Sequence, residues 1–329
     1  MNIKFNNVYV ENTSTVAGPF VIEGPLKDKF DKTFNDFYDN EKTFEKCEIK
    51  ELSEAIKILL DKSHHKEEDI DIGISADLMN QITISNYTFS KYSIPYLGVY
   101  NACASMCEEI LIASNLIDSK KAKRIICMTS SHNMTAERQF RNPVEYGAPK
   151  PKTTTFTVTG SAGIMLTNNK TDIKVTSATI GKVIDMGVSN VFDMGSVMTP
   201  SAAYTLNEHL KETKTNVNDY DLILTGDLGV YGKELFKEYC KKEYNINLDK
   251  NYDDSATMIY DFKNEDIYAG GSGPACLPLV TYSYVIPKMK ERLIKKVLLI
   301  ATGALMSPTM CNQKFSIPSI SHAICLEVV

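Results

Sequence analysis

Apolar and polar positions along the chain follow two alternating spacings. Residues 51–62 place apolar side chains at helical intervals, which predicts an amphipathic helix. Two short apolar runs bounded by polar turns, Ile70–Ser75 and Ala122–Thr129, predict buried strands. Between these runs, a short strand over Tyr96–Tyr100 is predicted to lead into an apolar helix over Cys103–Ile117. Helices and strands therefore alternate, which is typical of an α/β protein.

A long polar stretch interrupts this alternation. Residues 132–155 are rich in Arg, Lys and Pro, which predicts a long loop or short irregular elements. Long loops in compact domains often carry functional residues. A strand region with two central glycines is predicted next, over Thr157–Thr167.

The second half of the chain repeats the order of the first. The matching stretches are DIDIGISADL (69–78) with DYDLILTGDL (219–228), NACAS (101–105) with GGSGPAC (270–276), and KRIICMTSS (123–131) with KKVLLIATG (295–303). Three matches in the same order indicate a duplicated fold with partly parallel sheets covered by helices on both faces. We expect the two halves to span residues 1–170 and 171–329, with the functional site where they face each other.

Composition and charge narrow the function classes. The 329 residues are 43% hydrophobic and carry a formal net charge of -5, which is ordinary for a globular protein. A weakly acidic chain without a basic run makes nucleic acid a poor partner. The longest apolar stretch, Val297–Met306, is about half as long as a membrane-spanning helix. With no secretory signal at the N-terminus, we expect neither membrane crossing nor export by that route.

The cysteines predict thiols rather than a disulfide framework or a metal site. None of the 8 cysteines forms a CxxC pair, and a chain of this length does not need disulfide bonds for stability. Cys103 is the candidate for chemistry, because it lies between a short strand and a helix. The positive end of a helix dipole favours a thiolate there. Cysteine is also a small, readily buried residue, so a purely structural role stays open.

Other candidates lie at the ends of the predicted strands. His132 and Asn133 follow the strand that ends at Thr129, where α/β proteins commonly bind ligands, although a capping role is equally open for the histidine. Arg138 and Arg141 are spaced to share one side of a helix and could clamp two carboxylates, or could be a solvated surface pair. Asp227 and Ser272 lie at the ends of second-half elements, the latter in a GGSG turn.

These motifs resemble the thiolase and ketoacyl-synthase superfamily and, within it, a family of stage V sporulation proteins. The most specific stretches are LGVYNACASMCE (97–108), TSSHNMTAERQFRNPVEYG (129–147), DYDLILTGDLG (219–229) and YAGGSGPAC (268–276). Similar stretches span nearly the whole chain. The resemblance implies an α/β, thiolase-like fold, with duplicated halves in a layered αβαβα arrangement with mixed sheets.

The departures from the superfamily pattern concern catalysis. Condensing enzymes of the superfamily combine a Cys nucleophile with a His and a further His or Asn from the second half. Here Gly226 and Asp227 stand in place of the second-half His, and Gly271 and Ser272 stand in place of the further His or Asn. Cys103 is kept without its activating partners, so we expect a binding cleft rather than a condensing enzyme. An acyltransferase that uses Cys103 with another base, such as His132, is the alternative, and an assembly component with a vestigial cleft is a third.

The resemblance implies a ligand and partners. The ligand is pyridine-2,6-dicarboxylate (dipicolinic acid), alone or as its calcium chelate, taken up into the developing spore. The expected ligand-binding residues are Cys103, Ser131, His132, Asn133, Arg138, Arg141, Asp227 and Ser272. Arg138 and Arg141 would hold the carboxylates, and the small polar groups would surround the ring. No cofactor or metal site is expected. The expected partners are membrane proteins of the same stage V sporulation operon and a second copy of the chain, at the inner membrane of the forespore or spore.

Overall fold

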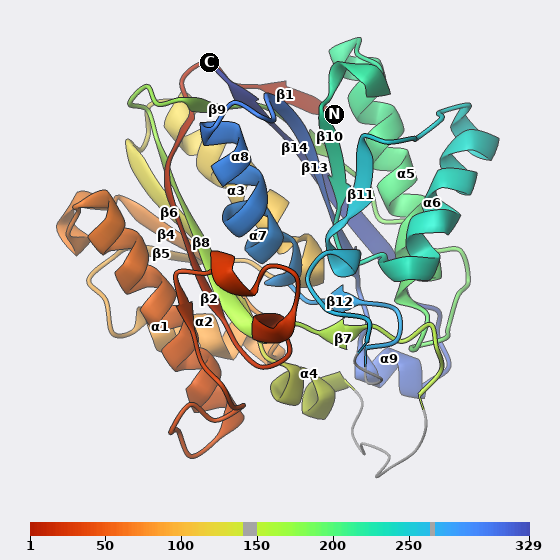
Figure 1. Cartoon of the computed structure of the whole chain (residues 1–329), viewed down its shortest axis with the longest axis horizontal. Helices are drawn as coiled ribbons and strands as arrows, with labels where there is room; N and C mark the ends of the chain where they lie inside the picture. Colours follow the sequence, from red (N-terminus) through yellow and green to blue (C-terminus); the bar gives the residue numbers. More distant parts are fainter. Residues whose placement is uncertain (141–149, 264–266) are drawn as a thin grey trace.

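In a computed structural model, residues 1–140, 150–263 and 267–329 are described, and most of the strands form one 12-stranded sheet (Figure 1). The strands of the first half are β1 (Asn2–Lys4), β2 (Tyr9–Ala17), β3 (Lys32–Thr33), β4 (Ile72–Ala76), β5 (Tyr96–Gly98), β6 (Arg124–Ser131), β7 (Phe156–Thr157) and β8 (Gly160–Thr167). Those of the second half are β9 (Ile173–Ile180), β10 (Leu222–Thr225), β11 (Tyr252–Asp254), β12 (Gly271–Ser272), β13 (Lys296–Ala304) and β14 (Ser319–Val328). Of these strands, β7 and β12 lie outside the large sheet, where they pair with each other.

Both halves of the sheet have the same strand order. In the first half, β2 and β6 flank β8 in antiparallel pairings, and β6, β4 and β5 follow in parallel. In the second half, β9, β14, β13, β10 and β11 repeat this order and these directions. The two half-sheets are joined where β2 meets β9, through the single pair Tyr9 and Lys174.

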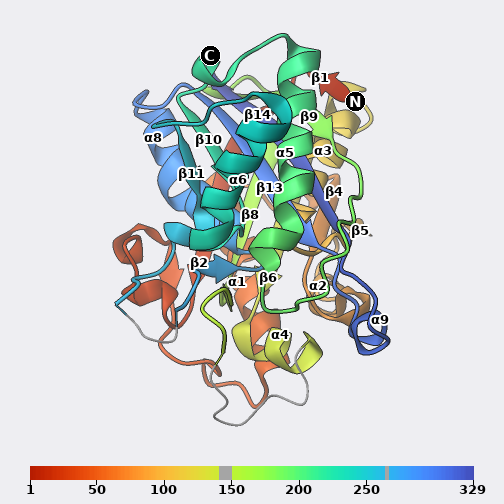
Figure 2. The same cartoon turned by 90° about the vertical axis from the view of Figure 1, so that its right-hand side faces the viewer.

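Helices cover and separate the half-sheets. They are α1 (Phe44–Ser63), α2 (Thr83–Phe89), α3 (Ser105–Asp118), α4 (Asn133–Phe140), α5 (Met194–Thr213), α6 (Gly229–Tyr244), α7 (Cys276–Val280), α8 (Ile286–Lys290) and α9 (Pro308–Asn312). The outer faces are covered by α1 and α2 on the first half and by α5 and α6 on the second, while α3, α7 and α8 lie between the half-sheets (Figures 1 and 2). This layering confirms the expected αβαβα thiolase-like fold.

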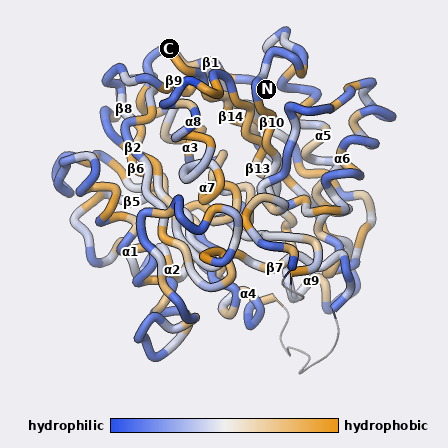
Figure 3. The backbone as a smooth tube through the Cα atoms, in the orientation of Figure 1, coloured by the Kyte–Doolittle hydropathy of each residue, from blue (hydrophilic) through white to orange (hydrophobic). Residues whose placement is uncertain are grey.

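The core follows the hydrophobic pattern. Apolar stretches concentrate on the strands and on the helices between the half-sheets, and the outer helices turn hydrophilic faces outward (Figure 3). Ile110 of α3 and Leu299 of β13 have no exposed surface and belong to one hydrophobic cluster that spans both halves. The predicted helix over 51–62 lies within the longer α1, because Thr43 caps that helix through a hydrogen bond from the Lys46 N–H.

The polar stretch 132–155 differs in part from the prediction. Its first residues form α4 rather than a loop, although residues 141–149 lie outside the described part of the chain. The buried face of α4 is made of Asn133, Thr135, Ala136 and Glu137, so no apolar stripe marks the helix in the sequence. Polar contacts hold that face instead, including a 2.8 Å hydrogen bond from Thr135 Oγ1 to Glu48 Oε2 on α1.

Candidate functional site

A cavity of about 490 Å³ lies where the two halves meet. Its walls come from the ends of β5 and β13, from α4 and from the start of α5. The lining residues include Leu78, Asn80, Gln81, Tyr100, Cys103, Ala136, Glu137, Gln139, Phe140, Thr155, Thr157, Met194, Met198, Ser272, Leu305, Met306 and Ser307. The volume lies within the range of about 300–1,000 Å³ that is typical of small-ligand sites.

The backbone before α3 brings Cys103 to this cavity. Ala102 adopts a φ of 48°, in the left-handed region that side chains other than glycine rarely enter. Ser105 holds the turn, because its hydroxyl donates to the Ala102 carbonyl at 2.7 Å and accepts from the Asn101 N–H at 3.2 Å. The Cys103 side chain is therefore presented partly exposed to the cavity from a short turn, one residue before the Ala104 cap of α3.

Asp227 is a buried carboxyl beside the GGSG turn that borders the cavity. It follows β10 with a φ of 68°, is 1% exposed, and accepts a 2.7 Å hydrogen bond from the Gly273 N–H. Burial raises its pKa to about 8. Its second oxygen, Oδ1, has no hydrogen-bond partner among the residues that the structure describes.

The neighbouring carboxyl changes the chemistry expected of Cys103. Burial and the charge of Asp227 raise the pKa of the Cys103 thiol well above its ordinary value. The position before a helix predicted a thiolate, and this prediction is wrong, because burial outweighs the helix dipole and a thiolate beside the Asp227 carboxyl would be unfavourable. No histidine or lysine is among the described residues that line the cavity. Cys103 is a protonated thiol beside an acid, which is a poor arrangement for acyl transfer.

The structure brings four of the expected ligand residues together. Cys103 and Ser272 line the cavity, and Asp227 lies behind the thiol. The fourth, Ser131, donates through its hydroxyl to the Val158 carbonyl at 2.7 Å. Its side chain also packs against Gly273 and so contacts the GGSG turn.

The other expected residues lie away from the cavity lining. The His132 ring is fully buried, the ring centres of Phe37 and Phe44 each lie 5.6 Å from its own, and its Nε2 donates to the Phe37 carbonyl at 3.0 Å. The Asn133 N–H donates to Thr159 Oγ1 at 3.0 Å. Burial lowers the pKa of His132 to about 4, so its ring is neutral at physiological pH.

The expected carboxylate clamp is not assembled from the described residues. The Arg138 guanidinium forms an ion pair with Glu45 and lies 5.7 Å from the centre of the Phe44 ring, with its side chain 54% exposed. Its partner in the predicted clamp, Arg141, lies outside the described residues. No arginine or lysine is among the described residues that line the cavity, although Lys150 pairs with the lining residue Glu137 at 3.2 Å.

Several polar groups of the site were not found from the sequence. Thr155 and Thr157 line the cavity at 3% and 6% exposure, and Thr155 Oγ1 has no hydrogen-bond partner in the described structure. Isolated threonines in a polar stretch give no sequence signal. His322 on β14 was not predicted as a site residue either. Its Nε2 lies 3.0 Å from Asn101 Nδ2, and this contact links the turn before Cys103 to the second half of the chain.

The family model of "Stage V sporulation protein AD (SpoVAD)" matches residues 2–327. The chain belongs to the SpoVAD family. It is 42% identical to stage V sporulation protein AD of Bacillus subtilis (strain 168) over 320 residues, which cover 97% of this chain and 94% of the relative. This finding confirms the resemblance seen in the sequence and assigns the chain to a family of sporulation proteins.

Solved structures support the fold of this SpoVAD family member. The crystal structure of 3-oxoacyl-[acyl-carrier-protein] synthase III from Aquifex aeolicus VF5 superposes with a TM-score of 0.62 at 14% identity, covering 97% of this chain and 99% of that one. The crystal structure of cerulenin-bound OleA from Xanthomonas campestris superposes with a TM-score of 0.61 at 12% identity, covering 98% of each chain. At these identities the likeness is one of fold. No helix among the described residues is long and apolar enough to cross a membrane.

Proposed function

We propose that the chain binds pyridine-2,6-dicarboxylate in the cavity between its halves without chemical conversion, and so supports uptake of this compound into the developing spore. The observation that carries the proposal is the cavity of about 490 Å³ itself, which Cys103 lines next to the buried carboxyl of Asp227. A thiol that faces a carboxyl and lacks a base can line a pocket but is poorly suited to form a thioester.

The cavity lining suits a flat aromatic acid. Tyr100 and Phe140 offer ring faces, and Met194 and Met198 offer adaptable apolar contact. The hydroxyl of Thr155 is a buried polar group without a partner in the described structure, and such a group gains most from a ligand oxygen. Uncharged hydroxyl and amide donors around an apolar floor are the usual means by which a pocket orients a small ligand.

Charge favours the calcium chelate as the bound form. The described lining contains the carboxyl of Glu137 and no cationic side chain, and Lys150 just outside it is paired with Glu137 at 3.2 Å. A free dicarboxylate would bring two more negative charges. Burying an unpaired anion is costly, and a chelate in which calcium balances both carboxylates avoids that cost. We therefore expect the chelate to bind more tightly than the free acid. In this proposal the protein acts at the inner membrane of the forespore, together with membrane proteins of the same operon.

Calorimetric titration of the full chain tests the proposal. The ligands are dipicolinate with and without calcium, with benzene-1,3-dicarboxylate as the matched compound that lacks the ring nitrogen. We expect saturable binding of dipicolinate, at least tenfold weaker binding by Thr155→Val, and unchanged binding by Thr171→Val. Thr171 bonds to the Val10 carbonyl at the opposite end of the strands. Absence of binding by the unmodified protein would remove the proposal.

Acyl-coenzyme A serves as the parallel ligand for the enzyme alternative. The proposal expects no acyl mass on Cys103 after incubation, because the thiol lacks a base. Acylated Cys103 without dipicolinate binding would instead support an acyltransferase. Failure of both ligands would favour the assembly role with a vestigial cleft.

A further inference from the structure

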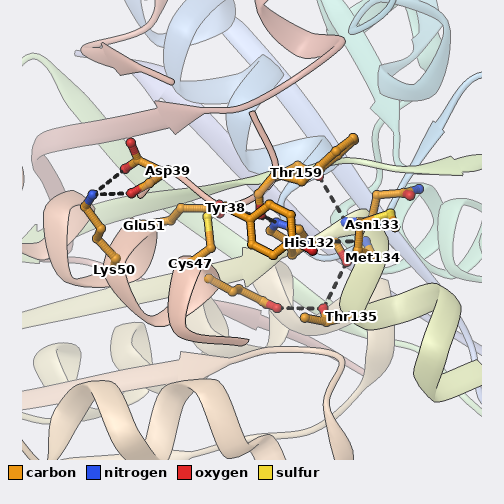
Figure 4. Close-up of polar contacts among 12 residues, drawn as sticks. Tyr38, Asp39, Cys47, Lys50, Glu51, His132, Asn133, Met134, Thr135 and Thr159 are labelled. Atoms are coloured by element: carbon orange, nitrogen blue, oxygen red, sulfur yellow. Dashed lines mark hydrogen bonds and ion pairs between the residues drawn. The ribbon is translucent and has the colours of Figure 1, made fainter. Parts of the chain in front are cut away.

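A second group of reactive side chains lies outside the cavity. Cys47 and Glu51 are one turn apart on α1, and His132 follows β6 directly before α4 (Figure 4). Their ligand atoms all lie within 4.8 Å of one another. Cys47 and His132 have no exposed surface, and Glu51 is 1% exposed. Sulfur, nitrogen and carboxylate oxygen together are the ligand set that zinc prefers.

The distances are close to those of a tetrahedral metal site. Cys47 Sγ lies 3.2 Å from Glu51 Oε1, and His132 Nε2 lies 3.9 Å from the same oxygen. Metal bonds of about 2.0–2.3 Å at tetrahedral angles place neighbouring ligand atoms about 3.3–3.5 Å apart. A metal ion would therefore require shifts of only some tenths of an ångström at these two contacts.

One oxygen of the group lacks a partner. Glu51 Oε2 is buried and forms no hydrogen bond in the described structure, although a buried polar atom left unpaired is costly. The nearby lysine does not supply a counter-charge, because Lys50 Nζ pairs with Asp39 Oδ2 at 2.8 Å. The neighbouring acid Glu48 has its own partners, Ser130 and Thr135. The free oxygen therefore points to a ligand that the described contacts do not supply.

We propose that Cys47, Glu51 and His132 bind a divalent metal ion of the zinc class. A thiolate and a carboxylate balance the two positive charges of the ion, and the imidazole binds as a neutral ligand, so the buried site carries no net charge. On binding, the thiol proton and any carboxyl proton pass to solvent, and no oxidation or reduction takes place.

The histidine must change its tautomer to take part. His132 Nε2 now donates to the Phe37 carbonyl, and Nδ1 accepts from the Met134 N–H at 3.2 Å. Coordination through Nε2 moves the ring proton to Nδ1 and loses the long Met134 bond. The Phe37 carbonyl oxygen, 3.0 Å from Nε2, is then free to act as the fourth ligand.

A metal ion at this site would fix the position of one wall of the cavity. Cys47 and Glu51 come from α1, whereas His132 leads into α4, and α4 lines the cavity through Ala136 and Phe140. Phe37, which precedes α1, contacts the group through its ring and its carbonyl oxygen. Binding the metal would therefore fix the position of α4 relative to α1, independently of what the cavity binds.

Cobalt substitution tests the site on the full chain. After treatment with a chelator, the protein is titrated with Co²⁺. We expect one ion per chain, near-ultraviolet absorption from a sulfur–cobalt bond and the visible bands of tetrahedral Co²⁺, all displaced by Zn²⁺. Cys47→Ser and Glu51→Gln should weaken binding at least tenfold. Cys240→Ser, which alters a buried thiol of α6 in the second half, should leave it unchanged.

Two results would overturn the proposal. One is the absence of tetrahedral Co²⁺ in the unmodified protein; the other is unchanged binding in folded Cys47→Ser and Glu51→Gln. If those variants do not fold, X-ray absorption of the unmodified protein with one equivalent of Zn²⁺ gives the number of sulfur ligands and tests the proposal. A single sulfur at about 2.3 Å among nitrogen and oxygen neighbours supports the site, and none or several sulfurs contradict it.

Discussion

Two side chains, Cys103 and Asp227, decide what the cavity can do. The thiol of Cys103 lines the cavity, and burial next to the Asp227 carboxyl raises its pKa and keeps it protonated. The carboxyl of Asp227 accepts a backbone hydrogen bond from the Gly273 N–H, yet burial dominates its pKa. The pair is a small polar contact inside a binding wall rather than a catalytic dyad.

Cys103 should therefore react slowly with iodoacetamide at pH 7.5. Its rate should lie at least tenfold below that of a free thiol, because only the thiolate reacts and the pKa is raised. Asp227→Asn should change the rate little at pH 7.5, because burial raises the pKa of Asp227 to about 8 and its carboxyl is mostly protonated there, but it should speed the reaction above pH 8, where the carboxylate would oppose ionisation of the thiol. Peptide mass spectrometry measures the rate, with free N-acetylcysteine as the reference thiol. Rapid labelling of Cys103 in the unmodified protein would contradict this assignment.

Asp227 should also make stability depend on pH. Its pKa is raised from 3.8 to about 8 in the folded state, so the folded protein holds this proton more tightly than the unfolded chain. Its contribution to stability is present below about pH 4 and is lost as the pH rises through about 8. We expect the free energy of unfolding in urea to fall between pH 5 and pH 9 by about 4 kcal/mol more in the unmodified protein than in Asp227→Asn. Parallel pH profiles of the two proteins would refute the raised pKa.

At the scale of elements, helix ends and helix docking shape the cavity. The first turn of α5 carries Met194 and Met198 to the cavity, and Asp193 caps that turn. The Asp193 carboxylate accepts from the Ser196 N–H at 3.2 Å and from the Ser196 hydroxyl at 2.8 Å. The cap therefore couples the stability of α5 to the shape of the apolar wall.

Asp193→Ala should lower the free energy of unfolding by about 1 kcal/mol, the usual cost of losing an N-cap. It should also weaken dipicolinate binding severalfold, because Met194 loses its fixed position. Asp193→Asn keeps a capping oxygen and should retain most of both properties. Urea denaturation and calorimetry measure the two effects. Equal losses in the Ala and Asn variants would show that the cap is not responsible.

The outward face of α4 carries Arg138, which sequence reasoning placed on the ligand. Because the guanidinium pairs with Glu45 at a largely exposed position, Arg138→Ala should change the free energy of unfolding by no more than about 1 kcal/mol. It should change dipicolinate affinity by less than threefold, as measured by calorimetry. A loss of tenfold or more would return Arg138 to the ligand site.

At the scale of the whole molecule, the continuous sheet leaves β5 as the edge strand of the first half. Leu97 on this strand is 45% exposed, and Tyr100 just beyond it is 50% exposed. An unpaired edge with exposed apolar side chains favours pairing with another strand. We therefore predict that a second copy of the chain pairs at this edge.

We expect the full chain to sediment as a dimer and Leu97→Lys to sediment mainly as a monomer, because a charge on the edge opposes strand pairing. Leu293→Lys is the matched control. Leu293 is 68% exposed and lies between α8 and β13, away from this edge, so the dimer should persist. A monomeric unmodified protein at micromolar concentration would contradict the expectation.

Particular elements show how far sequence reasoning reached. The strands over 70–75, 96–100 and 122–129 were predicted within a few residues, because each is a short apolar run between polar turns. Helix α4 was missed, because its buried face is polar. At the site, Cys103 and Ser272 were found through their small-residue turns, whereas Thr155 and His322 were not, since neither lies in a distinctive motif.

The sequence by itself determined the alternation of helices and strands, the duplicated order and the family. Hydrophobic spacing, turn residues and motif order are local properties of the chain, so they can be read along it. Only the tertiary structure decided which side chains meet. The pairing of Cys103 with Asp227 and the grouping of Cys47 with His132 join residues that are far apart in the chain. Such contacts depend on how helices pack on strands, which no local pattern encodes.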